Sequence, residues 1–219
     1  LLKMKNRVLL LGIDGATWDI LDEWIDQGHL PILKKLRESG SSGNLNTVIP
    51  TLSCTAWTSL FTGKNPGKHG ISNYLTKSGK LINSNHISED KIWNTLSEHN
   101  KRSCIINVPV TYPVEKLNGY MVSSFLTPPN EKNYVYPPKL KHLLDKFDYK
   151  ISIKNEKFAF LPDTEEIAQK KDDFLIEIYD VLDSRFNTLK ELMKKEWDFF
   201  FVVFNESSSI QYLFWDKKD

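Results

Sequence analysis

Continuous apolar runs and amphipathic segments alternate along the chain. The runs at 7–13, 102–108 and 198–204 are typical of strands that are buried on both faces of a parallel sheet. Shorter runs at 43–49 and 119–125 predict two further strands. In the intervening segments, apolar residues recur at three- and four-residue spacing, which predicts helices. The predicted helices span 17–28, 31–40, 54–63, 90–100, 136–147 and 165–197, the last being one long helix or two joined helices.

Strands that alternate with helices predict an α/β fold with a mainly parallel sheet flanked by helices. We expect residues 1–219 to form a single α/β domain that is the N-terminal portion of a longer domain, with 130–197 as a helical cap or insertion. Because the sequence stops within the helix that follows the last strand, we expect the fold to be C-terminally incomplete. Apolar residues of that helix would then be exposed and favour self-association, namely Leu213, Phe214 and Trp215.

Composition narrows the partners and the compartment. Of the 219 residues, 40% are hydrophobic and 26% are charged, which suits a sizeable core under a polar surface. The formal net charge of +1 provides no overall field for nucleic acid or for a membrane surface, so neither is an expected partner. Cys54 and Cys104 are too few for a disulfide framework, which favours a reducing, cytoplasmic location.

Two polar side chains lie at positions where α/β proteins bind their ligands. Asp14 follows the first apolar run, at the carboxyl end of a predicted strand, where open sheets bind ligands. Ser53 lies just before the helix that starts near Cys54, where unpaired N–H groups stabilise an alkoxide or hold phosphoryl oxygens. A helix-capping role is the alternative for each residue. The pairing of a carboxylate with a hydroxyl is nevertheless typical of a divalent metal and a nucleophile.

The loop "GKNPGKH" at 63–69 resembles a phosphate-binding P-loop only superficially. Three residues separate Gly63 from Gly67, where the Walker motif needs four, and His69 follows Lys68 where the motif has serine or threonine. We therefore predict a structural turn in which His69 is packed. The remaining histidines lack partners at metal-ligand spacing and are expected at the surface or at helix ends.

Four segments together resemble the type I phosphodiesterase/nucleotide pyrophosphatase family of the alkaline phosphatase superfamily, in its archaeal and bacterial branch. They are "LLLGIDGATWDIL", "PTLSCTAWTSLFTGKNPGKHGI", "INVPVTYPVEKLNGYMVSSFLTPP" and "WDFFFVVFNESSSIQYLFW". The resemblance implies an alkaline-phosphatase-like catalytic domain with two metal ions, usually zinc, that hydrolyses a small phosphoester or a nucleotide. It implies Ser53 as the nucleophile and metal-bridging ligand and Asp14 as a metal ligand. Their side chains are then expected close enough for one cation to contact both.

The chain departs from the family pattern after its last strand. The family carries Asp-x-x-x-His there, and the aligned positions are Ser208 and Tyr212, a hydroxyl and a phenol that are poor zinc ligands. We expect these two residues to be a polar residue at a helix start and a packed aromatic. Two hypotheses follow. One is a metal-dependent phosphoester or phosphodiester hydrolase. The other is an inactive, truncated or degenerate relative that acts as a binding protein, with a separate C-terminal half or a second copy as its partner.

Overall fold

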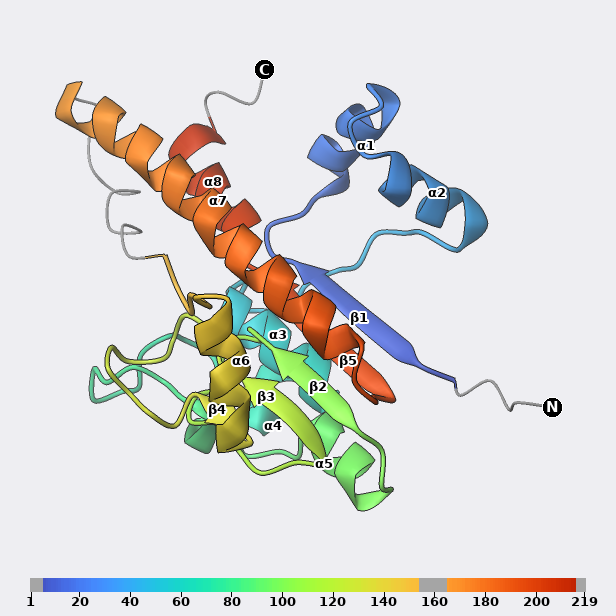
Figure 1. Cartoon of the computed structure of the whole chain (residues 1–219), viewed down its shortest axis with the longest axis vertical. Coiled ribbons are helices and arrows are strands. Elements are labelled where there is room, and N and C mark those ends of the chain that lie inside the picture. The colour runs from blue at the N-terminus through green and yellow to red at the C-terminus, as the bar shows by residue number, and fades with distance from the viewer. Residues whose placement is uncertain (1–5, 154–164, 216–219) are drawn as a thin grey trace.

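The computed structural model describes residues 6–153 and 165–215, and for 165–170 it describes the backbone only (Figure 1). Its centre is a five-stranded sheet in the order β1-β5-β2-β3-β4. The first four strands in that order run parallel, and β4 pairs antiparallel with β3. The strands are β1 (Val8–Ile13), β2 (Ser103–Ile106), β3 (Gly119–Val122), β4 (Val135–Tyr136) and β5 (Phe199–Phe204). The prediction of an α/β fold with a mainly parallel sheet is confirmed.

Helices cover both faces of the sheet, and β5 shows how the two cores are divided. Its residues alternate between the faces, as the two-residue period of a strand requires. Phe201 and Val203 pack with Phe61 and Trp93 from the helices α3 (Ser53–Thr62) and α5 (Ile92–Glu98). Phe200 and Val202 belong to the opposite core, with residues of α6 (Lys141–Lys146) and α7 (Glu165–Met193). Burial on both faces explains the unbroken apolar run of β5.

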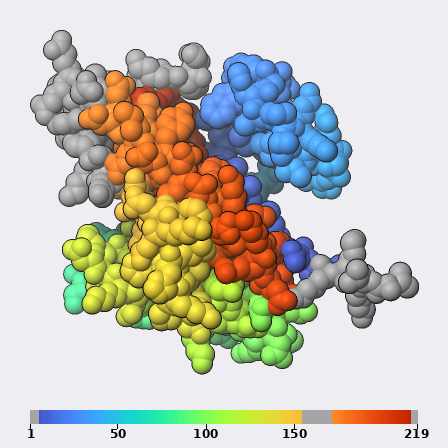
Figure 2. Space-filling model, viewed as in Figure 1, coloured from blue at the N-terminus to red at the C-terminus, as the bar shows by residue number. Residues whose placement is uncertain are grey.

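The remaining helices frame the carboxyl end of β1. The helices α1 (Trp18–Asp26) and α2 (Pro31–Ser39) form an arm on the outer side of β1, and Figure 2 shows this arm as a lobe beside α7. The predicted helix start is confirmed, since the Thr17 hydroxyl accepts a hydrogen bond from the backbone N–H of Asp19. The short elements are α4 (Pro66–His69), η1 (Ser84–His86) and η2 (Pro138–Leu140), and α8 (Glu206–Phe214) follows β5.

Three sequence-based predictions are wrong in detail. The segment 43–49 is an irregular loop that pairs with no strand, and Leu45 within it is 88% exposed. The segment predicted as a helix at 136–147 begins in β4 and becomes α-helical only at Lys141, since Pro137 and Pro138 lack the N–H groups that a helix requires. Leu213 is only 6% exposed, because it packs against the apolar side of α7.

The domain organisation stays a prediction. The proposed cap at 130–197 includes 154–164, which lie outside the described residues, as do 1–5 and 216–219 of the proposed single domain. Over the residues that the structure describes, no helix combines the length and the apolarity required to cross a bilayer.

His69 joins α3 to α4, as the predicted structural role requires. Its side chain is fully buried. The backbone N–H of Ile71 donates to His69 Nδ1 at 3.1 Å, so Nδ1 carries no proton. The proton therefore sits on Nε2, which lies 2.9 Å from Ser59 Oγ and donates to it. The pair of contacts fixes the turn that closes α3.

We predict that this buried imidazole makes the stability of the fold depend on pH. Burial lowers the pKa of His69 from its ordinary value of 6.5, because the charged ring would lose its hydration inside the fold. A charged ring would also carry a proton on Nδ1, where the Ile71 N–H already points. A lowered folded-state pKa means that the contribution is complete above the unfolded-state pKa of 6.5 and is lost as the pH falls below it. Urea unfolding midpoints measured between about pH 8 and about pH 5 test this.

The matched control is the exposed His29. The His29→Gln variant should retain the loss of stability at low pH, whereas His69→Gln should be less stable at every pH and should lose part of that dependence. Equal pH profiles for the wild type and His69→Gln would contradict the assignment.

Candidate functional site

A pocket of ≈ 400 Å³ lies at the carboxyl ends of β1 and β5. Three segments that are far apart in sequence form its walls: the turn after β1, the start of α3, and one side of α8. Its lining consists of Asp14, Gly15, Ser53, Ser208, Gln211, Tyr212 and Trp215. This is the edge of a parallel sheet at which open α/β folds bind their ligands.

Asp14 is the residue on which the polar contacts of the pocket converge. Its backbone N–H donates to the carbonyl of Phe204 at 2.8 Å, which continues the β1–β5 ladder by one residue. Gly15 follows with a φ of +76°, a conformation that glycine adopts without strain, and the chain turns away from the sheet there. The carboxylate is thereby left at the end of β1, facing α3 and α8.

Ser53 and Asp14 lie in direct contact. The Ser53 Oγ donates to the Asp14 carboxylate, at 3.1 Å from Oδ2 and 3.2 Å from Oδ1. The capping alternatives are wrong for both residues, because Leu52 occupies the N-cap of α3 and Thr17 that of α1. Ser53 is the first residue of α3, so the positive end of the helix dipole lies beside its hydroxyl. The catalytic and metal-binding roles of both residues stay predictions.

Ser208 and Tyr212 both line the pocket, since residues four apart share one side of α8. The Ser208 hydroxyl lies 2.8 Å from the carbonyl of Asn205, as expected of a polar residue near a helix start, and also 3.2 Å from Asp14 Oδ2. Tyr212 is 68% exposed, so its prediction as a packed aromatic is wrong. The alignment of both residues with the ligand positions of the family pattern was the signal that this side of α8 borders the pocket.

The residues present do not fit two zinc ions. In the described part of the chain, no group of three or more histidine, cysteine, aspartate or glutamate side chains lies close enough together to hold a metal ion. Asp14 is the only one of these residue types in the pocket lining. Ser208 places a neutral hydroxyl on its carboxylate. Zinc sites require three or more carboxylate, imidazole or thiolate ligands each, and this pocket offers one.

Sequence reasoning missed several residues that surround Asp14. Trp57 Nε1 donates to Asp14 Oδ1 at 3.1 Å, and the Ser207 hydroxyl donates to the Asp14 carbonyl at 2.6 Å. The spacing of Ser53 and Trp57, four residues apart on one helix, was a signal that could have placed Trp57 beside the site.

Burial raises the pKa of Tyr74 to about 12, and hydrogen bonding to Ser53 partly opposes this shift. Tyr74 is therefore a neutral phenol next to Ser53.

A buried ion pair holds the start of α8. Arg185 of α7 and Glu206 of α8 are each 1% exposed and form a salt bridge. The Arg185 guanidinium also donates to Asn205 Oδ1 at 3.0 Å and to the carbonyl of Ile151 at 2.8 Å. Asn107, at the end of β2, donates to the same Asn205 oxygen at 2.8 Å. These contacts fix the turn between β5 and α8.

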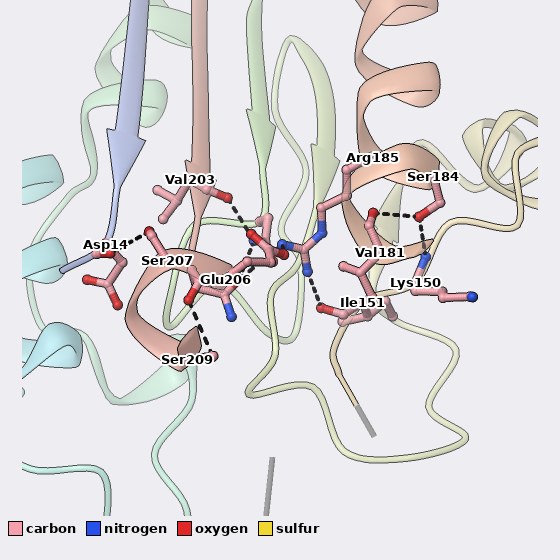
Figure 3. Close-up of polar contacts among 12 residues, drawn as sticks. Asp14, Lys150, Ile151, Val181, Ser184, Arg185, Val203, Glu206, Ser207 and Ser209 are labelled. Atoms are coloured by element: carbon pink, nitrogen blue, oxygen red, sulfur yellow. Dashed lines mark hydrogen bonds and ion pairs between the residues drawn. The ribbon is translucent and has the colours of Figure 1, made fainter. Parts of the chain in front are cut away.

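The contacts of Arg185 and Glu206 are connected to the pocket through the first residues of α8. Ser207 and Ser208, which both bond to Asp14, come directly after Glu206. Figure 3 shows Arg185 reaching from α7 toward Glu206, with Ser207 pointing to Asp14 on the other side of the same turn. Among the described residues, one Glu206 carboxylate oxygen has no hydrogen-bond partner, so Arg185 is the cation that compensates the charge of Glu206 at the start of α8. The ion pair therefore positions the α8 wall of the pocket.

We predict that Arg185→Met lowers the free energy of unfolding by about 3–5 kcal/mol, because it leaves the Glu206 carboxylate buried and unpaired. The double variant Arg185→Met with Glu206→Gln should recover a large part of this loss, since no charge then remains buried. Arg37→Met, which breaks an exposed ion pair with Asp22, should change the stability by less than about 1 kcal/mol. Urea unfolding of the four proteins measures these differences, and an Arg185→Met loss no larger than that of Arg37→Met would refute them.

Comparison with known proteins identifies the fold and the family. No curated protein gave a match. One similar solved structure is phosphonoacetate hydrolase from Sinorhizobium meliloti 1021 in complex with phosphonoacetate, with a TM-score of 0.56, 15% identity, and coverage of 93% of this chain and 47% of that chain. The same enzyme with phosphonoformate gives a TM-score of 0.55, 16% identity, and coverage of 98% and 52%.

This chain thus spans about half the length of these two structures. At such low identity the similarity establishes a shared fold. The family model described as "Type I phosphodiesterase / nucleotide pyrophosphatase" matches residues 8–219, and the chain therefore belongs to that family, within the alkaline phosphatase superfamily.

Proposed function

We propose that this chain carries the nucleophile of a site that hydrolyses a small phosphate ester or diester. The observation that carries the proposal is the position of Ser53, whose Oγ lies 3.1 Å from the Asp14 carboxylate at the first residue of α3. A serine in this position combines a carboxylate that can accept its proton with helix N–H groups that favour a phosphoryl anion.

In the proposed reaction, Ser53 Oγ attacks phosphorus and passes its proton to the Asp14 carboxylate. The new bond joins Oγ to phosphorus, and the bond between phosphorus and the alcohol oxygen of the substrate breaks. The alcohol leaves with the proton from Asp14. The first-turn N–H groups of α3 stabilise the negative oxygens of the phosphoryl group, and the neutral phenol of Tyr74 is a further donor near Ser53. Water then cleaves the bond between phosphorus and Ser53 Oγ, which releases phosphate from a monoester substrate or a phosphate monoester from a diester and restores Ser53.

The family usually uses metal ions, and Asp14 and Ser53 are the residues of this chain that would contribute to a metal site. Ser208 and Tyr212 do not supply the carboxylate and the imidazole that two zinc ions would need. The proposal therefore assigns to this chain a nucleophile and its carboxylate partner, and assigns no step to a metal.

A second candidate function is binding of a phosphorylated ligand without turnover. The observation in its favour is the hydroxyl of Ser208 beside Asp14, at a position where the family pattern has a metal-binding carboxylate. A site that keeps the anion-binding start of α3 but lacks metal ligands would still retain a phosphoryl group. The two candidates share the pocket and differ in whether phosphorus–oxygen bonds are cleaved.

We predict that Ser53→Ala lowers the hydrolysis of bis(4-nitrophenyl) phosphate by at least about 10³-fold, because it removes the attacking oxygen. Thr51→Ala, which removes an exposed hydroxyl two residues earlier, should leave the rate unchanged. The assay follows release of 4-nitrophenol with and without added zinc. Mass spectrometry after acid quenching should find the 4-nitrophenyl ester of phosphoserine at position 53 in the wild type and in Thr51→Ala.

Two other results would redirect the interpretation. Hydrolysis that survives Ser53→Ala would refute the proposed nucleophile. Absence of hydrolysis and of phosphoserine in the wild type, together with calorimetric binding of a non-hydrolysable phosphonate that Ser53→Ala abolishes, would refute the enzyme and support the binding function.

A further inference from the structure

A cleft of ≈ 270 Å³ lies at the end of the sheet opposite to the Asp14 pocket, and we call it the β3–β4 cleft. Its lining includes Arg102, Asn118, Gly119, Tyr120, Tyr136 and Lys139. They come from the segment before β2, the start of β3 and the end of β4. Because β4 runs antiparallel to β3, its last residue lies beside the amino ends of β2 and β3. In the sheet order β3 and β4 lie at the edge remote from β1 (Figure 1).

The cleft forms where β4 leaves the sheet. In the described chain β4 has two residues, which pair with Met121 and Val122 of β3. The same register would place Gly119 opposite Pro138, which has no N–H group for a sheet hydrogen bond. Gly119 and Tyr120 therefore have a strand partner on the β2 side alone, and their other edge borders the cleft. Backbone groups of β3 can thus reach a ligand there.

The charged side chains of the cleft are cations. Arg102 and Lys139 line it, and no carboxylate of a described residue does. The Arg102 backbone is fixed at the start of β5, because its N–H donates to Asp198 Oδ2 at 2.8 Å and its carbonyl accepts from the Asp198 N–H at 2.8 Å. Its guanidinium donates through Nη1 to Glu196, whose side chain is 74% exposed. The remaining guanidinium N–H groups can bind a second acceptor, and an exposed ion pair is weak enough to permit it.

Two tyrosine rings border the cleft from opposite faces of the sheet. Tyr120 packs against the core under α6 and α7, whereas Tyr136 packs against the core under α3 and α5. Both side chains are half-buried, so each keeps part of its ring accessible from the cleft. The Lys195 ammonium lies 5.7 Å from the centre of the Tyr120 ring and adds a third positive charge nearby. The cleft therefore combines positive charge with aromatic surface.

We propose that the β3–β4 cleft binds a small organic anion that carries an aromatic ring. Arg102 and Lys139 supply charge-assisted hydrogen bonds to the phosphoryl or carboxyl oxygens of the ligand. The rings of Tyr120 and Tyr136 contact the aromatic ring of the ligand. A volume of ≈ 270 Å³ accommodates a ligand of about one ring and one anionic group. This inference does not depend on the chemistry of Ser53, because the cleft and the Asp14 pocket share no lining residue.

The test uses phenylphosphonate as its probe, because a carbon–phosphorus bond replaces the ester bond that the proposed reaction would cleave. Calorimetry should give a Kd of about 1 mM or tighter. Methylphosphonate has the same anionic group without a ring, and benzyl alcohol has the ring without a charge. Each should bind at least about tenfold more weakly than phenylphosphonate. Methylphosphonate or benzyl alcohol binding as tightly as phenylphosphonate would overturn the assignment of an aromatic anion.

The double variant Arg102→Gln with Lys139→Gln should weaken phenylphosphonate binding by at least about tenfold. The matched control is Arg37→Gln with Lys34→Gln, which makes the same change of charge on α2 and should bind like the wild type. Circular dichroism checks that both double variants are folded. Equal weakening by the two double variants would overturn the proposal, since it would indicate a general effect of charge.

The variant Ser53→Ala separates this inference from the proposed function. It should bind phenylphosphonate like the wild type, whether or not the chain hydrolyses phosphoesters. Binding that Ser53→Ala abolishes and the Arg102/Lys139 double variant retains would place the ligand in the Asp14 pocket and overturn the proposal. Absence of phenylphosphonate binding to the wild type would overturn it as well.

Discussion

The parallel pairing of β1 with β5 is the contact on which the candidate site depends. Its register places Ile13 opposite Phe204, and one further backbone hydrogen bond joins Asp14 to the Phe204 carbonyl. Residues separated by about 190 positions in sequence therefore end their strands at the same level. Asp14 leaves β1 where α8 begins after β5, and only for this reason can Ser207 and Ser208 reach it. A shift of one residue in this register would turn every β1 side chain to the opposite face and separate the two segments.

Local signals in the sequence were sufficient for β1, β2, β3 and β5 and for the positions of the two central site residues, but not for β4. The run of β5 was predictable because burial on both faces demands an unbroken apolar sequence, and Asp14 and Ser53 were predictable because each stands at the end or the start of such an element. The contacts around them were not. The Arg185–Glu206 pair and the Ser208–Asp14 contact join residues 21 and 194 positions apart, and no short-range pattern encodes them. The segment 43–49 shows the converse, since its local sequence suggested a strand but the segment pairs with no strand in the structure.

The polar contacts of Asp14 give a physical account of what Ser208 does to the site. A carboxylate at that position would place a second negative charge next to Asp14, and the two charges would repel unless a cation lay between them. The hydroxyl of Ser208 adds no charge there and shares its one proton between the Asn205 carbonyl and Asp14, whereas Ser53 and Trp57 donate to the Asp14 carboxylate. These donors stabilise the anion without a metal ion. The Asp14 carboxylate therefore has hydrogen-bond donors from this chain without a metal ion. This is the physical argument for the second candidate function, a pocket that binds a phosphorylated ligand without hydrolysing it.

The pocket is open to solvent on its α8 side, and this affects the strength of its polar contacts. The pocket wall includes Tyr212 and Trp215, which are 68% and 51% exposed, so water reaches the Asp14–Ser53 contact. Interactions between charged and polar groups weaken in such a solvated environment and strengthen when water is excluded.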